Sequence, residues 1–332
     1  MKLLKQRKEF GILFIILALV IIITIINPAF LKPANLFDMI RSNAVYGVMA
    51  FGMLLILITG GIDLTCSSTI VLCAVLQGSY LKSHPDTNVV VIFLMVIVAG
   101  AIVGLVNGLL ITKLKIPPIV ATLGIQTITN AAVLYVTKGA WISDLPQWWK
   151  DFGAFTIPKI PSGNTYTGIY TQVLLLIAVG IITWLILRYT LVGRGLYAVG
   201  GNAQSAERVG YKVDLITIFA YIYCGITAGL ASIVSVSIVG SVDPNTFTGY
   251  EMDVIAITVL GGASLSGGVG TVFGTTLGII LMSVIKNGLI LVHISGYWQD
   301  AIMGAIILVT IIIDQIRQNR EADKAVKVDV EE

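Results

Sequence analysis

Charged residues are scarce in this sequence. They make up 12% of its 332 residues, whereas a soluble domain carries about 25%. Hydrophobic residues make up 56%, and the mean hydropathy is +0.93. This balance excludes a soluble globular domain and predicts a polytopic membrane protein. The net charge of +3, with no basic stripe carrying interleaved aromatic residues, argues against a nucleic-acid partner.

Signatures of catalysis and of metal binding are also missing. The chain has no Walker A motif, no G-x-S-x-G and no H-E-x-x-H, and His84 and His293 are isolated. The three cysteines, Cys66, Cys73 and Cys224, lie in apolar segments without a C-x-x-C, which suits packed interfaces. We therefore expect no enzyme, no metal and no cofactor. Any uphill transport must be driven by a partner or by an ion gradient.

Long hydrophobic runs are abundant, and several have the length of a membrane helix. They lie at 10–26, 44–59, 67–81, 89–111, 117–137, 171–189, 214–240, 251–262, 268–291 and 297–313. The shorter runs cannot cross a bilayer straight through alone. The pattern predicts an all-α polytopic membrane protein with about ten transmembrane helices, some of them broken at glycine-rich breaks.

Positive charge gives the orientation of these helices. If the helices alternate in direction, four basic groups fall on one side, and the positive-inside rule makes that side the cytoplasm. The groups are Lys2, Lys5, Arg7 and Lys8; Lys113 and Lys115; Arg188, Arg194, Arg208 and Lys212; and Arg317, Arg320, Lys324 and Lys327. Lys32 and Arg41 fall on the other side. We expect a bacterial inner-membrane protein with both termini cytoplasmic.

This topology divides the chain into a permease domain, 1–316, and a cytoplasmic tail, 317–332. Within the first part, residues 138–169 form an external loop, whose tryptophans suit an interfacial belt or a docking surface. Residues 192–213 form a cytoplasmic loop.

Two glycine pairs interrupt the apolar sequence, one in each half. Gly60 and Gly61 stand in "TGGIDLT", and Gly261 and Gly262 stand in "LGGASLSGG". Paired interruptions of this kind point to the solute path of a transporter. Gly270, Gly274 and Gly278 follow the second pair as a stripe that predicts close approach of another helix.

Asp63 follows the first glycine pair inside an apolar segment, where an isolated charge costs about 2.5 to 3.5 kcal/mol. One interpretation is a helix cap, in which the carboxylate accepts hydrogen bonds from the N–H groups that open the next helix. The other is a role in the path, where Asp63 binds a hydroxylated solute or carries a proton. The two interpretations are compatible.

Further polar residues lie in, or at the ends of, the apolar segments. The path candidates are Asp63, Thr65, Asn107, Thr122, Gln126, Asn130, Glu251 and Asp253. Interhelical hydrogen bonding is an equally good interpretation for Asn107 and Asn130, and a better one for Thr122.

The loop "VGRGLYAVGGNAQSAERVGYKVD" predicts a short helix from Ala203 to Val209, with Asn202 as its N-cap and Gly210 just after its end. We expect this helix to pack against nothing in its own chain. It would then suit docking into a groove of another protein, or it is an ordinary amphipathic connector.

Six motifs, in order, resemble the permease subunits of ATP-binding-cassette (ABC) importers of the ribose, xylose and galactose type. They are "GGIDLT", "VGLVNGLL", "IPPIVATLG", "VTKGAWISDLP", "VGRGLYAVGGNAQSAERVG" and "GYEMDVIAITVLGGASLSGGVG", within residues 35–315. In one respect the chain departs from the family. The family usually continues its first motif with Val-Gly-Ser, whereas this chain has Cys66-Ser67-Ser68.

The resemblance implies a permease pair, identical or not, on cytoplasmic ABC ATPase subunits, served by an extracytoplasmic solute-binding protein. It also implies that the cytoplasmic loop docks in the ATPase, through Gly201, Asn202, Ala203, Ala206, Glu207, Arg208 and Gly210. The expected solute is a monosaccharide or related polyol. The alternatives are a nucleoside, inositol or autoinducer importer on the same scaffold, and a stand-alone ion-coupled carrier in which Asp63 or Asp253 shuttles protons.

Overall fold

A computed structural model of the chain describes residues 2–162, 165–299, 301–306, 308–309, 312 and 316. Within these ranges the chain forms helices and one antiparallel hairpin. The elements are α1 (Lys2–Ile26), η1 (Pro28–Leu31), α2 (Pro33–Ile58), α3 (Cys66–Ser83), α4 (Val89–Thr112), α5 (Pro118–Thr137), α6 (Gln147–Ala154), β1 (Thr156–Ser162), β2 (Thr165–Tyr170), α7 (Thr171–Tyr189), α8 (Leu191–Gly201), α9 (Ala203–Arg208), α10 (Val213–Val239), α11 (Tyr250–Leu260) and α12 (Val272–Leu291). Residues 296–299 and 301–306 are also helical. The predicted tail, 317–332, lies outside the described residues.

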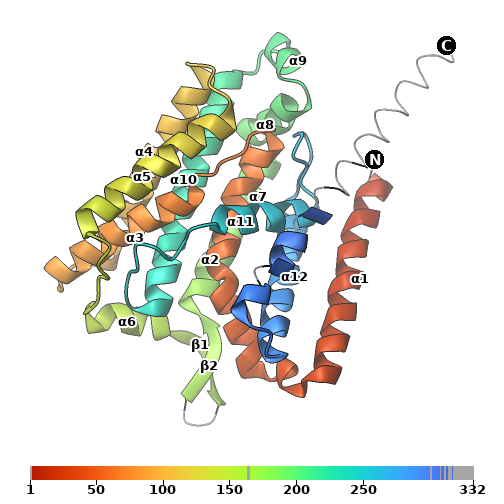
Figure 1. The fold of residues 1–332 in the computed structure, drawn as a ribbon. Helices are drawn as coiled ribbons and strands as arrows, with labels where there is room; N and C mark the ends of the chain where they lie inside the picture. Colours follow the sequence, from red (N-terminus) through yellow and green to blue (C-terminus); the bar gives the residue numbers. More distant parts are fainter. Residues whose placement is uncertain are drawn as a thin grey trace.

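The long helices lie side by side in one bundle (Figure 1). At one end of the bundle lies α9, and α1 begins toward that end. At the opposite end lie α6 and the β1–β2 hairpin. We call these the α9 end and the hairpin end. The hairpin pairs Thr156 with Tyr170 and Ile160 with Thr167, with an irregularity between Ile157 and Ile160.

Six described helices are long and apolar enough to cross a membrane: α2, α4, α5, α7, α10 and α12. This confirms the predicted membrane class. The count of about ten is not confirmed, since α11 has 11 residues and measures only about 16 Å. The apolar part of α1 is also short, at Phe10–Ile26. A helix as short as α11 cannot span the hydrocarbon core of a bilayer alone.

The core of the bundle is built around α2. Residues 47–58 of α2 are buried without interruption, which fits a helix that is apolar on all sides. Beside it, α4 crosses α10 with almost no side chain between the two backbones. A Cβ added at Gly100 would collide with the carbonyl oxygen of Gly225, and one at Gly104 with that of Tyr221. The crossing therefore depends on these two glycines.

The predicted external loop holds two features that the sequence did not indicate. One is the hairpin, whose first strand contains Pro158 and Pro161, residues that normally argue against a strand. The other is Trp149, which is fully buried and stacks on Phe152 at 5.4 Å. An interfacial belt is thus wrong for Trp149, although Trp141 is exposed.

Candidate functional site

Both glycine breaks end a helix with the same backbone motif. After α2, the Gly61 N–H donates to Ile56 O at 3.1 Å and the Gly60 N–H to Leu57 O at 2.9 Å. After α11, the Ala263 N–H donates to Thr258 O at 3.1 Å and the Gly262 N–H to Val259 O at 2.8 Å. This pair of bonds defines a Schellman cap, whose left-handed residue is Gly60 (φ +79°) in one break and Gly262 (φ +92°) in the other.

The two breaks touch each other and α8 at the α9 end. The Gly268 N–H donates to the carbonyl oxygen of Ile58 at 2.9 Å, which joins the loop after α11 to the last turn of α2. Gly200, near the end of α8, fits between them: a Cβ there would collide with Ile58 O and lie 2.5 Å from Gly268 N. We call the contact of Ile58, Gly60, Gly200, Gly267 and Gly268 the glycine junction.

Tyr197 fastens α8 to the same place. Its hydroxyl donates to the carbonyl oxygen of Gly270 at 2.8 Å. Burial raises the pKa of Tyr197 to about 12, so the hydroxyl remains a donor at physiological pH. The end of α8 is thus held by a side chain as well as by the close approach at Gly200.

Asp63 is held entirely by its own chain. It is 1% exposed, and its Oδ1 accepts from the Thr65 N–H at 2.8 Å and from the Thr65 hydroxyl at 2.5 Å. Thr65 in turn accepts from Asn107 Nδ2 of α4 at 2.7 Å. The chain of bonds runs from α4 through Thr65, the N-cap of α3, to Asp63. Asp63 thus closes a turn just before α3 and does not bond the N–H groups of the helix itself, which has no side-chain cap hydrogen bond. A path role for Asp63, Thr65 and Asn107 stays a prediction.

Gln126 and Glu251 meet in a second polar group. Gln126 Nε2 of α5 lies 3.1 Å from Glu251 Oε1 and 3.2 Å from Ser67 Oγ. Glu251 is buried in the first turn of α11, where the helix dipole favours its charge. Its Oε2 has no hydrogen-bond partner among the described residues. Ser67 is one of the residues that depart from the family pattern, and its hydroxyl takes part in this network.

The two remaining path candidates, Asn130 and Thr122, differ in what their side chains face. Asn130 lines a small cavity of about 70 Å³ together with Ser67, Phe247 and Thr248. Thr122 turns its hydroxyl to its own helix, donating to Pro118 O at 2.8 Å. The Thr122 bond stays within α5 and is not the interhelical bond that the sequence favoured, whereas Asn130 faces the small cavity.

Asp253 forms an ion pair that the sequence analysis missed. Lys286 Nζ of α12 lies 2.7 Å from Asp253 Oδ2 and 3.7 Å from the ring centroid of Tyr46. Tyr46 stacks on Tyr250 with centroids 4.8 Å apart. A lone lysine inside an apolar segment was the available signal, since such a residue faces a partner or a wet cavity.

The predicted docking helix is present. α9 has Asn202 as its N-cap, whose Oδ1 accepts from the Ser205 N–H at 2.8 Å, and Gly210 (φ +97°) follows its end. Glu207 and Arg208 are exposed, but Ala206 is buried in the core of its own chain. The expectation that this helix packs against nothing in its own chain is wrong on the face of Ala206, because Tyr211 N–H bonds Ala206 O and the loop folds back.

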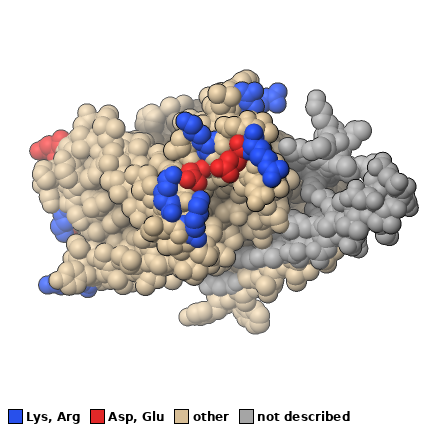
Figure 2. Space-filling model, turned by 90° about the horizontal axis from the view of Figure 1, so that it is seen from above, with Lys and Arg blue, Asp and Glu red and all other residues tan. Residues whose placement is uncertain are grey.

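Charged side chains gather on the face seen from the α9 end, surrounded by uncharged surface (Figure 2). Among the residues of this end, Lys113 and Lys115 both reach Asp214, at 2.7 and 3.5 Å. Membrane proteins concentrate charged residues at the end that faces the cytoplasm or a protein partner. Within the described ranges no three His, Cys, Asp or Glu side chains gather as a metal site would need.

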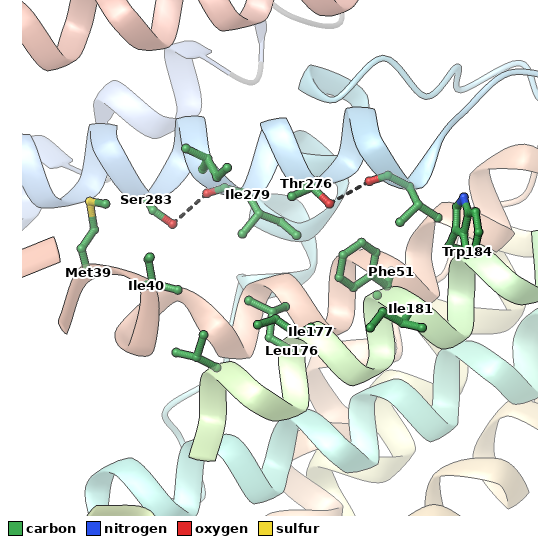
Figure 3. A pocket seen from close by; sticks show the side chains of 14 residues that line it. Met39, Ile40, Phe51, Leu176, Ile177, Ile181, Trp184, Thr276, Ile279 and Ser283 are labelled. Carbon is green, nitrogen blue, oxygen red and sulfur yellow. Dashed lines mark hydrogen bonds between the residues drawn. The ribbon is translucent and has the colours of Figure 1, made fainter. Parts of the chain in front are cut away.

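An apolar groove of about 560 Å³ lies between α2, α7 and α12 (Figure 3). Phe51, Leu176 and Ile279 point into it. Its hydroxyls are turned to their own helix, since Ser283 donates to Ile279 O and Thr276 to Val272 O. The lining is almost entirely apolar, so the groove is a poor site for a polyol and is not the candidate solute site.

Apolar spans, paired glycine breaks and buried polar groups define a polytopic membrane protein of the permease class. A family model described as branched-chain amino acid transport system / permease component matches residues 35–311. The chain belongs to this family. It is a transport permease and not an enzyme, as the sequence predicted.

Known relatives cover nearly the whole chain. The chain is 34% identical to the ribose import permease protein RbsC of Bacillus subtilis, over 90% of this chain and 89% of that protein. It is 36% identical to the autoinducer 2 import system permease protein LsrC of Photorhabdus luminescens, over 95% and 92%. It is 32% identical to the galactose/methyl galactoside import permease protein MglC of Salmonella typhimurium, over 95% and 96%. No solved structure matches the chain.

Proposed function

We propose that this chain is the permease subunit of an ABC importer, and that it forms the path for a monosaccharide or a related hydroxylated solute. The α9 end faces the cytoplasm and docks on an ABC ATPase pair. The hairpin end receives solute from an extracytoplasmic binding protein. A second permease, identical or paralogous, completes the assembly. Ribose, galactose and autoinducer 2 are the solutes named for the relatives, which supports this class of solute.

One observation carries the proposal: the exposed helix α9 is joined to both glycine breaks. Asn202, the N-cap of α9, directly follows Gly201 and the end of α8. Gly200 in turn packs against Ile58 O and Gly268 N. A displacement of α9 by a closing ATPase therefore reaches α2 and the loop after α11 through backbone contacts alone.

The physical reason is the hardness of these contacts. Side chains absorb small shifts by changing rotamer, whereas two backbones in van der Waals contact must move together. Chain direction reverses at both breaks, so a shift there tilts α2 against α3 and α11 against α12. This tilting would open and close the path between the polar groups of α3, α5 and α11.

The alternative, an ion-coupled carrier, needs a carboxylate that can take up and release a proton along the path. Asp63 is buried and accepts two hydrogen bonds from Thr65, and Asp253 is paired with Lys286 at 2.7 Å. Protonation of Asp253 would leave the Lys286 ammonium without its partner charge, which is costly in a largely buried pair. The geometry therefore favours a permease driven from outside the chain.

Reconstitution tests the proposal directly. The permease alone in proteoliposomes should not accumulate D-ribose or D-galactose under a proton or sodium gradient. With an ABC ATPase and a sugar-binding protein from the same operon, uptake should require ATP. Accumulation by the lone chain under an ion gradient would refute the proposal.

Two variants test whether α9 couples the permease to the ATPase. Glu207→Lys reverses an exposed charge on α9 and should reduce ATPase co-purification, and Gly201→Pro should do the same by distorting the entry to α9. Lys150→Glu, at an exposed position at the hairpin end, is the matched charge control. Full transport and ATPase association in both α9 variants would show that this helix is an ordinary connector.

A further inference from the structure

A polar cavity of solute size opens beside Asp253, one of the predicted path residues. It has a volume of about 500 Å³ and lies between α2, α11, α12 and residues 299, 303 and 304. Tyr46, Tyr250, Asp253, Lys286 and Gln299 line it. Binding sites for small molecules have volumes of roughly 300 to 1,000 Å³, so a sugar ring fits with room for water.

Two candidate membrane spans contribute to the cavity. Tyr46 is near the middle of α2, and Lys286 lies within α12, both of which are candidate spans. Lys286 comes late in α12, whose last residue, Leu291, accepts a hydrogen bond from Asn27 at the hairpin end. The cavity is therefore nearer the hairpin end than the glycine junction, on the side from which an imported solute arrives.

The charged pair in the cavity is close, largely buried and neutral overall. The side chains of Lys286 and Asp253 are only 19% and 18% exposed, at a separation of 2.7 Å. The ammonium also lies over the ring of Tyr46, and that ring is stacked on Tyr250. Contacts with a carboxylate and with an aromatic face together fix the ammonium in position.

We propose that this cavity is a solute-binding station, and that it takes a neutral polyhydroxylated ring rather than an amino-acid zwitterion. The inference rests on the proposed function, which makes the chain a solute permease. The family description mentions amino acids and the relatives are named for sugars, so the distinction is a real choice.

The hydrogen-bonding capacity of the Lys286–Asp253 pair favours a polyol over a zwitterion. An ammonium has three donors and a carboxylate about four acceptor sites, so the pair at 2.7 Å leaves most of them available. Neighbouring hydroxyl groups both donate and accept, and can bridge the two charges without separating them. A zwitterion could be bound by both charges only by splitting the pair, and splitting a largely buried pair is strongly unfavourable.

Saturation-transfer NMR on the full-length permease in lipid nanodiscs tests the station without any partner protein. The probes are D-ribose, D-galactose, methyl β-D-galactoside and L-leucine. Gly304 lines the cavity and a Cβ there meets nothing within 4 Å, so Gly304→Trp should fill the space without disturbing the fold. Gly296 has the same open surroundings and does not line the cavity, so Gly296→Trp is the matched control.

We expect at least one sugar to bind the unaltered chain and Gly296→Trp equally, and about tenfold more weakly to Gly304→Trp. The double variant Asp253→Asn with Lys286→Met should also lose about tenfold, because it removes two charge-assisted hydrogen-bonding groups. The surface pair Lys82–Asp144, at 3.9 Å, provides the control double variant Lys82→Met with Asp144→Asn. Size-exclusion profiles and melting temperatures identify any variant that fails to fold.

Three results would overturn the inference: no sugar signal with the unaltered chain, sugar binding unaffected by Gly304→Trp, or L-leucine binding that Gly304→Trp removes. None of these results bears on ATP-driven import, which is measured with the assembled transporter. Conversely, sugar binding in nanodiscs would stand even if the lone chain proved to be an ion-coupled carrier. The two proposals can therefore fail separately.

Discussion

The two glycine breaks have the same backbone geometry and opposite surroundings. Gly60 and Gly262 both occupy the left-handed position of a Schellman cap. Beyond Gly60 the chain turns inward, and Asp63 accepts from the Thr65 N–H at 2.8 Å in a buried site. Beyond Gly262 the chain buries Ala263 and then reaches the surface, where Ser264 Oγ accepts from the Ser266 N–H at 3.2 Å. The Ser264 hydroxyl is the acceptor in this turn, as the Asp63 carboxylate is in the turn after Gly60.

Helix termination and locking of the turn therefore depend on different residues. Glycine ends the helix and reverses the chain in both places, because only glycine adopts the left-handed conformation without strain. The residues that follow decide whether the turn is locked. We infer that the first break is the fixed side of the glycine junction and that the second break, facing α8, is its adjustable side.

The largest effect is expected at Gly200, where the two breaks meet. In Gly200→Ala the new methyl group collides with Ile58 O and crowds Gly268 N, so the bond between Ile58 and Gly268 must break. Overpacking typically costs about 1 to 3 kcal/mol, and because this clash is with backbone that cannot change rotamer, we expect ATP-driven uptake to fall to background. Hydrogen exchange of the Gly268 amide should accelerate.

Gly124→Ala is the matched control, because a Cβ at Gly124, in α5, meets nothing within 4 Å. It should retain uptake and leave exchange at Gly268 unchanged. Equal behaviour of the two alanine variants would remove the junction from the coupling route.

The next largest effect is expected at Asp63. Asp63→Ala leaves the Thr65 N–H and hydroxyl without their acceptor in a buried site, which costs about 2 to 3 kcal/mol. Asp63→Asn keeps an amide oxygen in the same place and should retain much of the stability. We expect uptake to be abolished in the alanine variant, and apparent melting temperatures in detergent to rank wild type, asparagine, alanine. Near-normal uptake by both variants would show that the buried acid is dispensable.

Local signals explain what the sequence could predict. α5 was expected at 117–137 and spans Pro118–Thr137, because an apolar run and its boundary residues are encoded within a few positions. α9 was expected from Ala203, and its caps at Asn202 and Gly210 are present for the same reason. The buried apolar length of α2 likewise follows from composition alone.

Contacts between residues far apart in the chain could not be predicted from the sequence. The ion pair of Lys286 with Asp253 and the ring of Tyr46 come from three separate helices, and no spacing rule joins them. The meeting of Gly200 with both breaks is of the same kind. The family resemblance placed Ala206 among the ATPase contacts, but the return of the chain at Tyr211 buries it.

A third prediction tests whether the two breaks are equivalent in their backbones. Gly60→Ala and Gly262→Ala each force a left-handed residue to carry a Cβ, which costs about 1 to 2 kcal/mol. A Cβ at Gly60 reaches Ser266 O at 3.4 Å, an ordinary contact, and one at Gly262 meets nothing within 4 Å. The two variants should therefore lower the melting temperature by similar amounts. A much larger loss at Gly60 would mean that the first break is held by more than its cap.

The smallest effect is expected at Ser264, the counterpart of Asp63 in the second break. Ser264→Ala removes the acceptor for the Ser266 N–H, but that bond is long and lies in an exposed turn, where water can replace it. We expect a loss of about 0.5 kcal/mol and nearly full uptake. The measurement is the same pair of assays used for Asp63→Ala. A loss as large as that of Asp63→Ala would show that the second break is locked as firmly as the first, and the division into a fixed and an adjustable side would be wrong.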